Sequence, residues 1–196
     1  MKRLPNPLVC LISCVCAFVS PAATKPNVVF VLADDLGYAD LGCYGAEDIQ
    51  TPNIDRLATQ GVRLTQFYAN GPVCTPTRCA LMTGRYQQRV GGLEWAIPPG
   101  KKHLGLPGSE KSLASLLRAA GYATALSGKW HLGYTPDRAP NAHGFDHFFG
   151  LLSGNHDYFT HRENNGEPDL HLNGEAIAME GYSTHLITRH AVQFLG

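Results

Sequence analysis

The chain has 196 residues, enough for one ordinary domain with a hydrophobic core. Hydrophobic residues make up 44% and charged residues 16%, a composition that excludes a disordered or collagen-like chain. The formal net charge is zero, so no global charge favours nucleic acid or an anionic membrane as a partner.

The N-terminus has the layout of a secretory signal peptide. Two basic residues precede an apolar run over residues 8–19, and the small residues at 20–23 offer a cleavage site. The run is shorter than the roughly 20 residues of a transmembrane helix. We therefore predict a cleaved signal over residues 1–23, no stable membrane insertion, and a secreted or periplasmic protein. A lipoprotein-like box at residues 11–14 is the alternative.

Three cysteines remain after removal of that signal: Cys43, Cys74 and Cys79. An odd number in an exported chain means that at least one is unpaired or chemically special. Residues 24–196 show no shift in composition and no internal repeat, so they are predicted to belong to one domain.

Strands and helices are predicted to alternate along this domain, which favours an α/β fold with a largely parallel sheet flanked by helices. Three helices carry apolar stripes that are expected to face inward: residues 54, 57 and 58; 113, 116, 117 and 120; 186, 187, 191 and 194. In chain order the predicted elements are a strand at 28–32, a helix opened by Thr51-Pro52 and ended by Gly61, a strand at 62–68, a short helix from Pro76 to about Gly84, a helix after Ser109 ended by Gly121, a strand at 122–126 and a helix at 183–195, with a loop at 98–108 and a polar turn at 164–169.

Asp34 and Asp35 directly follow the first predicted strand. Ligands of open α/β sheets bind at such carboxyl ends. Two adjacent carboxylates repel each other unless a cation or hydrogen-bond donors neutralise them, and hard oxygen ligands suit Ca²⁺ or Mg²⁺. The pair therefore indicates a metal site, with a solvated turn or a helix N-cap as the alternative.

Cys74 stands at the predicted start of a helix, and Arg78 follows one turn later. A helix N-terminus exposes free N–H groups and attracts anions, and a cysteine there gains reactivity. A tetrahedral oxyanion such as sulfate or phosphate fits this pattern. A buried structural cysteine with a surface arginine is the alternative.

Lys129 and His131 follow the predicted strand at 122–126. Residues two apart project to the same side of an extended segment. A lysine can bind an anion and a histidine can move protons near neutral pH, although an amphipathic strand end with a satisfied histidine has the same pattern.

These segments together resemble the sulfatase family. Cys74–Arg85 is similar to the first sulfatase signature, Cys-x-Pro-[Ser/Thr]-Arg-x-x-Leu-x-Thr-Gly-Arg, and Gly121–Gly133 is similar to the second. Asp34-Asp35 precedes both in the order that the family shows, and Thr77 departs from the commoner serine while keeping a hydroxyl. The resemblance runs from about Pro26 to the end, including residues 51–57 and 144–146.

The resemblance implies an alkaline phosphatase-like fold and an unusual nucleophile. In sulfatases a formylglycine-generating enzyme oxidises the motif cysteine, here Cys74, and the hydrated aldehyde attacks the sulfur of a sulfate ester. Its second hydroxyl then expels sulfate from the covalent intermediate. By the same resemblance, Asp34, Asp35 and residue 74 would bind a divalent cation, Ca²⁺ in preference to Mg²⁺.

The other motif residues acquire roles in the same way. Arg78 would stabilise the nucleophile, Lys129 would hold the sulfate, and His131 would hydrogen-bond the diol and assist its collapse. Ser153 lies where the family sometimes adds another site residue, on a looser match. The expected substrate is a sulfated carbohydrate or an aryl sulfate.

Family members take two further metal ligands, a histidine and a lysine from later in the chain, and no segment before Gly196 matches them. We therefore expect residues 24–196 to be a truncated N-terminal portion of the catalytic domain, incomplete at the C-terminus, with little activity alone. The alternatives are a phosphate or phosphonate monoester hydrolase of the same superfamily, a non-catalytic fragment that binds sulfated glycans, and a thiol protein using Cys74 and Cys79.

Overall fold

A computed structural model describes residues 25–196, which form two compact units. The first unit ends at Leu36 and the second spans Gly37–Gly196, and each is described by itself. The predicted signal peptide at 1–23 lies outside the described residues. Within residues 25–196, no helix is long and apolar enough to cross a membrane.

The predicted strand at 28–32 is not formed in the first unit. Its side chains are exposed, from 40% at Leu32 to 86% at Val31. A β-strand must pair its backbone N–H and C=O groups with a neighbouring strand. The unit that ends at Leu36 offers no second strand among its described residues, so this apolar segment stays extended and unpaired within its own unit.

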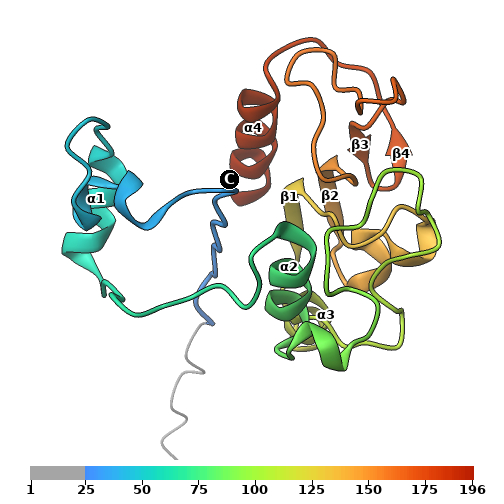
Figure 1. Ribbon diagram of the computed structural model, residues 1–196, viewed down its shortest axis with the longest axis horizontal. Helices are drawn as coiled ribbons and strands as arrows, with labels where there is room; N and C mark the ends of the chain where they lie inside the picture. The colour runs from blue at the N-terminus through green and yellow to red at the C-terminus, as the bar shows by residue number, and fades with distance from the viewer. Residues whose placement is uncertain (1–24) are drawn as a thin grey trace, which may run out of the picture. The chain divides into compact units, whose positions relative to one another are not determined.

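The helices of the second unit match the predicted order (Figure 1). Pro52 occupies the first turn of α1 as expected, and Gly61 caps its last turn by donating its N–H to the Leu57 carbonyl. Helix α2 starts at Cys74, two residues before the expected Pro76, and ends at Gly84 in the left-handed conformation. The bounds are Pro52–Gln60 for α1, Cys74–Thr83 for α2, Leu113–Ala119 for α3 and Ser183–Leu195 for α4.

A four-stranded sheet with the order β1-β2-β3-β4 forms the centre of the second unit. Its strands are β1 (Ala125–Lys129), β2 (His147–Leu151), β3 (His171–Leu172) and β4 (Glu175–Ala176). Strands β1 and β2 pair in parallel over five residues, and β3 and β4 add two short antiparallel ladders. The α/β class is confirmed, but β1 is shifted by three residues from the strand predicted at 122–126, so that Lys129 lies inside the strand, and β2 was not predicted.

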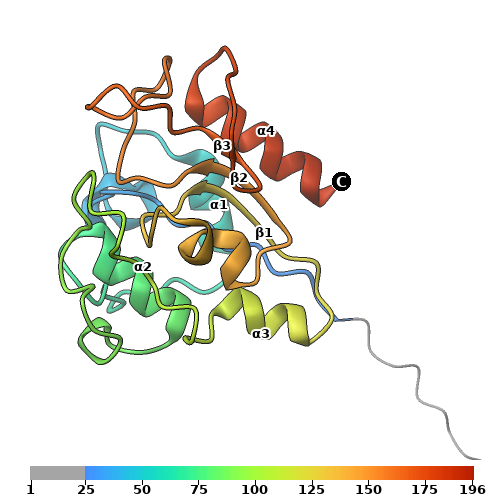
Figure 2. The ribbon, with the colours of Figure 1, turned by 90° about the vertical axis from the view of Figure 1, so that its right-hand side faces the viewer.

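Helices cover both faces of the β1–β2 pair. Phe148 and Phe149 are adjacent in β2 and both fully buried, so their side chains must point to opposite faces. Phe148 joins a core with Trp130 and Leu132, whereas Phe149 packs with Leu186 of α4. Figure 2 shows α4 on one side of the two strands and α3 on the other. The residues of β2 therefore serve two cores at once.

Strands β1 and β2 approach each other closely at a pair of glycines. Gly128 faces Gly150 in the register, and a Cβ atom at Gly150 would lie 2.0 Å from the Gly128 carbonyl oxygen. Gly150 also has a φ of 150°, a conformation that side chains disfavour. Only glycine fits at Gly150, which faces the residue just before Lys129, the last residue of β1.

Three sequence predictions about apolar segments are wrong. Residues 62–68 form no strand, and Val62 and Phe67 are exposed. The stripes of α1 and α3 do not face a core, since Leu57 is 67% and Leu116 is 55% exposed. Helix α3 instead buries the small Ala114, because the Ser112 hydroxyl at its cap donates to the His143 carbonyl and holds that side of the helix inward. The inward stripe of α4 is confirmed at Leu186, while Phe194 is partly exposed.

Candidate active site

Cys74 is the first residue of α2 and is half-buried. The next residue, Thr75, is fully buried and fastens this helix end to two other segments. Its hydroxyl donates to the His131 carbonyl at 3.0 Å and accepts the N–H of Ile97 at 3.2 Å. Sequence reasoning treated Thr75 as a variable position of the motif, yet it joins the helix to His131, which contacts Cys74, and to Ile97, which contacts His131.

His131 lies two residues beyond β1 and is 4% exposed. Its backbone has a φ of 51°, so the extended geometry of β1 ends before this residue. Its Nδ1 atom lies 3.1 Å from Cys74 Sγ, and its Nε2 atom lies 3.0 Å from the Ile97 carbonyl oxygen. Because a carbonyl only accepts, Nε2 carries the proton, and in the neutral ring Nδ1 is the acceptor that faces Cys74.

Arg78 lies one turn after Cys74 in α2 and is half-buried. Its guanidinium donates to the Lys129 carbonyl at 2.7 Å, which ties α2 to the end of β1. Lys129 is the last residue of β1 and is also half-buried. The structure therefore gathers Cys74, Arg78, Lys129 and His131, which the sequence placed in two separate motifs.

Asp34 and Asp35 belong to the first unit, and both are exposed there. Asp35 has a φ of 55°, the left-handed conformation that aspartate tolerates better than most residues. Their predicted role as metal ligands stays a prediction.

Ser153 and Asp169 are buried polar residues whose hydrogen-bond partners were not foreseen from the sequence. Ser153 is 1% exposed, and its hydroxyl donates to the Asn155 carbonyl at 2.7 Å. Asp169 was assigned to a polar turn, yet it is 1% exposed and its carboxylate accepts the N–H groups of Leu152 and Ser153. Nothing in the residue pattern around Asp169 marks it as buried, because the partners lie 16 and 17 residues away.

The three cysteines of the described chain are free thiols. Cys79 is fully buried, and burial, assisted by the nearby Glu110, raises its pKa to about 11. A thiol in that environment stays protonated near neutral pH and is inert. Cys74, by contrast, is only half-buried and contacts His131.

Tyr134 is a partly buried phenol whose pKa responds to Cys74 and to two nearby carboxylates. Burial raises the pKa of its phenol, and the negative charges of Glu163 and Asp169 and the nearby Cys74 act in the same direction. The phenol thus stays neutral, and its buried oxygen has no hydrogen-bond partner in the described structure.

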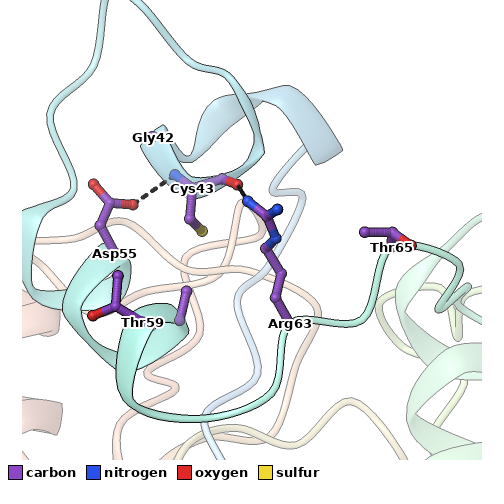
Figure 3. Close-up of a pocket in the computed structure, with 7 residues that line it drawn as sticks. Gly42, Cys43, Asp55, Thr59, Arg63 and Thr65 are labelled. Carbon is purple, nitrogen blue, oxygen red and sulfur yellow. Dashed lines mark hydrogen bonds between the residues drawn. The ribbon is translucent and has the colours of Figure 1, made fainter.

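A separate cavity lies in the α1 region and contains none of the predicted site residues (Figure 3). The Arg63 guanidinium donates to the Cys43 carbonyl, and Asp55 accepts the Cys43 N–H at 2.7 Å. These bonds explain why α1 packs on the short helical turn Gly42–Tyr44. The cavity is lined by Gly42, Cys43, Asp55, Ala58, Thr59, Arg63 and Thr65.

Low pH is expected to loosen the segment behind the site through His156. Burial lowers the pKa of His156, although its hydrogen bond to the Asp169 carbonyl opposes the shift. The unfolded chain, with an ordinary histidine pKa of about 6.5, then binds more protons than the folded chain. The stability that neutral, buried His156 allows is fully present above that pH and is lost progressively as the pH drops below it. Urea denaturation at pH 7.5 and 5.5 measures this loss, and His156→Gln should make it smaller. An equal loss in wild type and variant would refute the assignment.

Comparison with known proteins decides the family. The family model described as Sulfatase matches residues 26–196. The chain belongs to the sulfatase family. Human steryl-sulfatase is 49% identical over 142 residues, covering 67% of this chain and 24% of that protein. Bovine arylsulfatase A is 48% identical over 132 residues, covering 66% of this chain and 26% of that protein. This chain thus spans about a quarter of the length of the curated relatives it matches.

Similar solved structures confirm the fold. The crystal structure of Ps i-CgsB superposes with a TM-score of 0.81 and 39% identity, covering 87% of this chain and 41% of that one. A second structure of Ps i-CgsB, in complex with k-i-k-neocarrahexaose, gives a TM-score of 0.76 at 38% identity, covering 83% and 39%. The segments that resemble the two sulfatase signatures form α2 and β1.

Proposed function

We propose that this sulfatase chain carries the nucleophile and the sulfate-binding groups of a sulfuric ester hydrolase. One observation supports the proposal above all: His131 Nδ1 lies 3.1 Å from Cys74 Sγ at the N-terminus of α2. A base that faces a nucleophile within hydrogen-bond distance, and is itself oriented by a third group, is the usual arrangement of nucleophilic catalysis. Here the Ile97 carbonyl is that third group.

Formylglycine at position 74 would supply an oxygen nucleophile and a second hydroxyl on the same carbon. His131 accepts a hydrogen bond at Nδ1 from a hydroxyl at the position that Cys74 Sγ now occupies. In the overall reaction, the ester S–O bond breaks, the departing alcohol takes up a proton, and water supplies the oxygen of the released sulfate. His131 can hold one proton at Nδ1 during this exchange, because Nε2–H remains bonded to the Ile97 carbonyl.

The cations around residue 74 suit a sulfate group. The N-terminus of α2 presents backbone N–H groups, and its partial positive charge favours an anion there. Arg78 brings a guanidinium from the same helix, and its bond to the Lys129 carbonyl fixes the two signature segments relative to each other. Charges held in place before reaction stabilise developing negative charge without the cost of reorganisation.

The carboxylates of Asp34 and Asp35 suit a hard divalent cation such as Ca²⁺ or Mg²⁺, and the resemblance to sulfatases favours Ca²⁺. Two carboxylates make only part of a Ca²⁺ shell, which takes six to eight oxygens. No cluster of three or more His, Cys, Asp or Glu side chains within residues 25–196 could hold a metal ion. The two aspartates would thus form part of a larger site, and the cation would polarise the sulfate oxygens.

The substrate that we propose is a sulfated carbohydrate or an aryl sulfate. Relatives are named steryl-sulfatase and arylsulfatase, and one similar structure contains an oligosaccharide, k-i-k-neocarrahexaose. Export through the predicted signal would expose the protein to such molecules outside the cytoplasm. A formylglycine-generating enzyme would act on Cys74 along the way.

Cys74 is expected to carry an aldehyde when the chain is produced together with a formylglycine-generating enzyme. Mass spectrometry of the peptide containing Cys74 measures the conversion, and a carbonyl-reactive probe should label the same peptide. Cys79, five residues later, is the internal control and should remain a thiol, since it lies outside the motif position and is fully buried. An unmodified Cys74 in a host that has the enzyme would favour a non-catalytic protein.

The nearest alternative, a phosphate or phosphonate monoester hydrolase, makes a different prediction. Aryl sulfate and aryl phosphate, assayed in parallel with the aldehyde-bearing chain and Ca²⁺, separate the two activities. Faster hydrolysis of the sulfate supports the proposal, and the reverse order contradicts it. Cys74→Ala serves as the blank, because it removes the only group at position 74 that can be converted.

A further inference from the structure

Asp169 is a buried carboxylate behind the site, and the proposed mechanism does not use it. Its Oδ1 atom accepts the N–H of Leu152 at 3.0 Å, and its Oδ2 atom accepts the N–H of Ser153 at 3.1 Å. His171 Nε2 lies 3.3 Å from Oδ1. Burying a carboxylate costs free energy unless hydrogen-bond donors satisfy it, and three such groups surround Asp169. This arrangement indicates that the carboxylate holds the segments that supply the donors.

The peptide of Leu152 connects Asp169 to His131. Its N–H is held by the carboxylate, and its carbonyl accepts the His131 N–H at 3.1 Å. This residue follows β2 directly, so the parallel ladder continues beyond the strands to the catalytic histidine. A shift of the Leu152 peptide would therefore move the backbone of His131.

Gly154 extends the same connection to the imidazole ring. A Cβ atom at Gly154 would lie 2.6 Å from His131 Cε1 and about 3 Å from both ring nitrogens. The turn Leu152–Gly154 thus packs its backbone against the ring, leaving no space for a side chain. The carboxylate of Asp169 holds the first two residues of this turn, and the third residue limits how the ring can rotate.

A carboxylate suits this position better than any neutral side chain of the same size. Here the two consecutive N–H groups bind one carboxylate oxygen each, and among side chains of this size only an ionised carboxyl offers two acceptor atoms. An asparagine would place its NH₂ group against one of them, leaving a buried donor without a partner. The chemistry of the site therefore selects aspartate.

We propose that Asp169 is a positioning residue for His131. It holds the turn Leu152–Gly154 against the imidazole, so that Nδ1 stays directed at residue 74. The inference rests on the proposed function for the role of His131, but its geometry can be tested without a sulfate ester. A purely structural role would instead lower stability and leave the histidine ring as it is.

The test uses the full chain with Cys74 kept as a thiol, which a host without the modifying enzyme provides. The alkylation rate of Cys74 by iodoacetamide is measured at fixed pH by peptide mass spectrometry, with Cys43 as the internal reference. Imidazole ¹⁵N shifts of His131 report its tautomer in the same samples. Asp169→Ala should lower the alkylation rate of Cys74 by about fivefold, the size expected for one lost hydrogen bond. The ¹⁵N spectrum of His131 should then also show the second tautomer of its ring. Asp169→Asn should show a smaller change in the same direction.

Asp157→Asn is the matched control. Asp157 also accepts two backbone N–H groups, those of Phe159 at 3.0 Å and Thr160 at 2.7 Å, but it is exposed. This variant should leave the Cys74 rate and the His131 signals unchanged. An equal effect of both substitutions would overturn the proposal, because general loosening would then explain the result.

Gly154→Ala tests the contact between the turn Leu152–Gly154 and the His131 ring directly. It provides the test of the proposal if Asp169→Ala does not fold. Its methyl group must displace the His131 ring, so Cys74 should again react more slowly. Folded Asp169→Asn and Gly154→Ala chains with wild-type alkylation rates and ¹⁵N shifts would refute the proposal. Failure to hydrolyse sulfate esters would count against the proposed function alone, since neither readout requires turnover.

Discussion

In aldehyde-bearing chains that hydrolyse an aryl sulfate, even slowly, replacing His131 with alanine is expected to lower the rate by about 10²–10⁴-fold, the usual contribution of a positioned acid–base group. The reason is geometric. His131 is the side chain whose ring nitrogen faces Cys74, and the Ile97 carbonyl keeps the other nitrogen protonated. The measurement is the initial rate per aldehyde-bearing molecule, compared with the unsubstituted chain under the same conditions.

A second histidine provides the control for that experiment. His190 in α4 stacks on Phe149 at a centroid distance of 3.5 Å, on the face of the sheet opposite the Trp130 core. His190→Gln should keep the turnover within about twofold, as expected for a side chain without contact to the reacting groups. The assignment of His131 fails if its alanine variant, with the aldehyde intact, retains more than a tenth of the rate.

Replacing Trp130 with alanine is expected to reduce the free energy of unfolding by about 3–5 kcal/mol, the usual cost of truncating a large buried aromatic side chain. Trp130 is 2% exposed and packs edge-on against Phe145 at 6.1 Å. Its indole N–H donates to the Arg138 carbonyl at 2.9 Å. Urea denaturation, followed by circular dichroism, measures the change.

The chain contains a matched control, because its only other tryptophan, Trp95, is 74% exposed. Trp95→Ala should change stability by no more than about 0.5 kcal/mol, as surface substitutions usually do. Trp130→Phe keeps most of the apolar volume and loses the indole N–H, so its cost should fall between the two alanine variants. Similar losses for both tryptophans would contradict the burial that the fold assigns to Trp130.

The position of Trp130 links this stability to function. It stands between Lys129 and His131 in the second signature, and its N–H donates to the Leu151 carbonyl at 2.9 Å. The residue whose side chain anchors the core is therefore also held by its backbone against the end of β2, between the two proposed site residues. We expect Trp130 variants to lose activity at the temperatures at which they begin to unfold.

Local sequence patterns correctly predicted the helix ends that capping residues determine and the helix that has a long amphipathic repeat. Pro52 at the start of α1 and the left-handed glycine at Gly84 after α2 lie where the residue pattern indicates. Helix α4 has the predicted bounds, since an amphipathic repeat of 13 residues is a strong signal. The segments at 28–32 and 62–68 were predicted from apolar content alone, and neither forms a strand, because a strand requires a partner that no local pattern specifies.

By itself, the sequence determined the family and the four side chains that the structure gathers, since Cys74, Arg78, Lys129 and His131 stand in two long signatures. Only the tertiary structure decided how they act together. The Nε2–H tautomer of His131 depends on the Ile97 carbonyl, and the orientation of its ring depends on the turn held by Asp169. Both contacts join residues far apart in the chain, and no local residue pattern indicates which distant backbone group a side chain or ring nitrogen will bind.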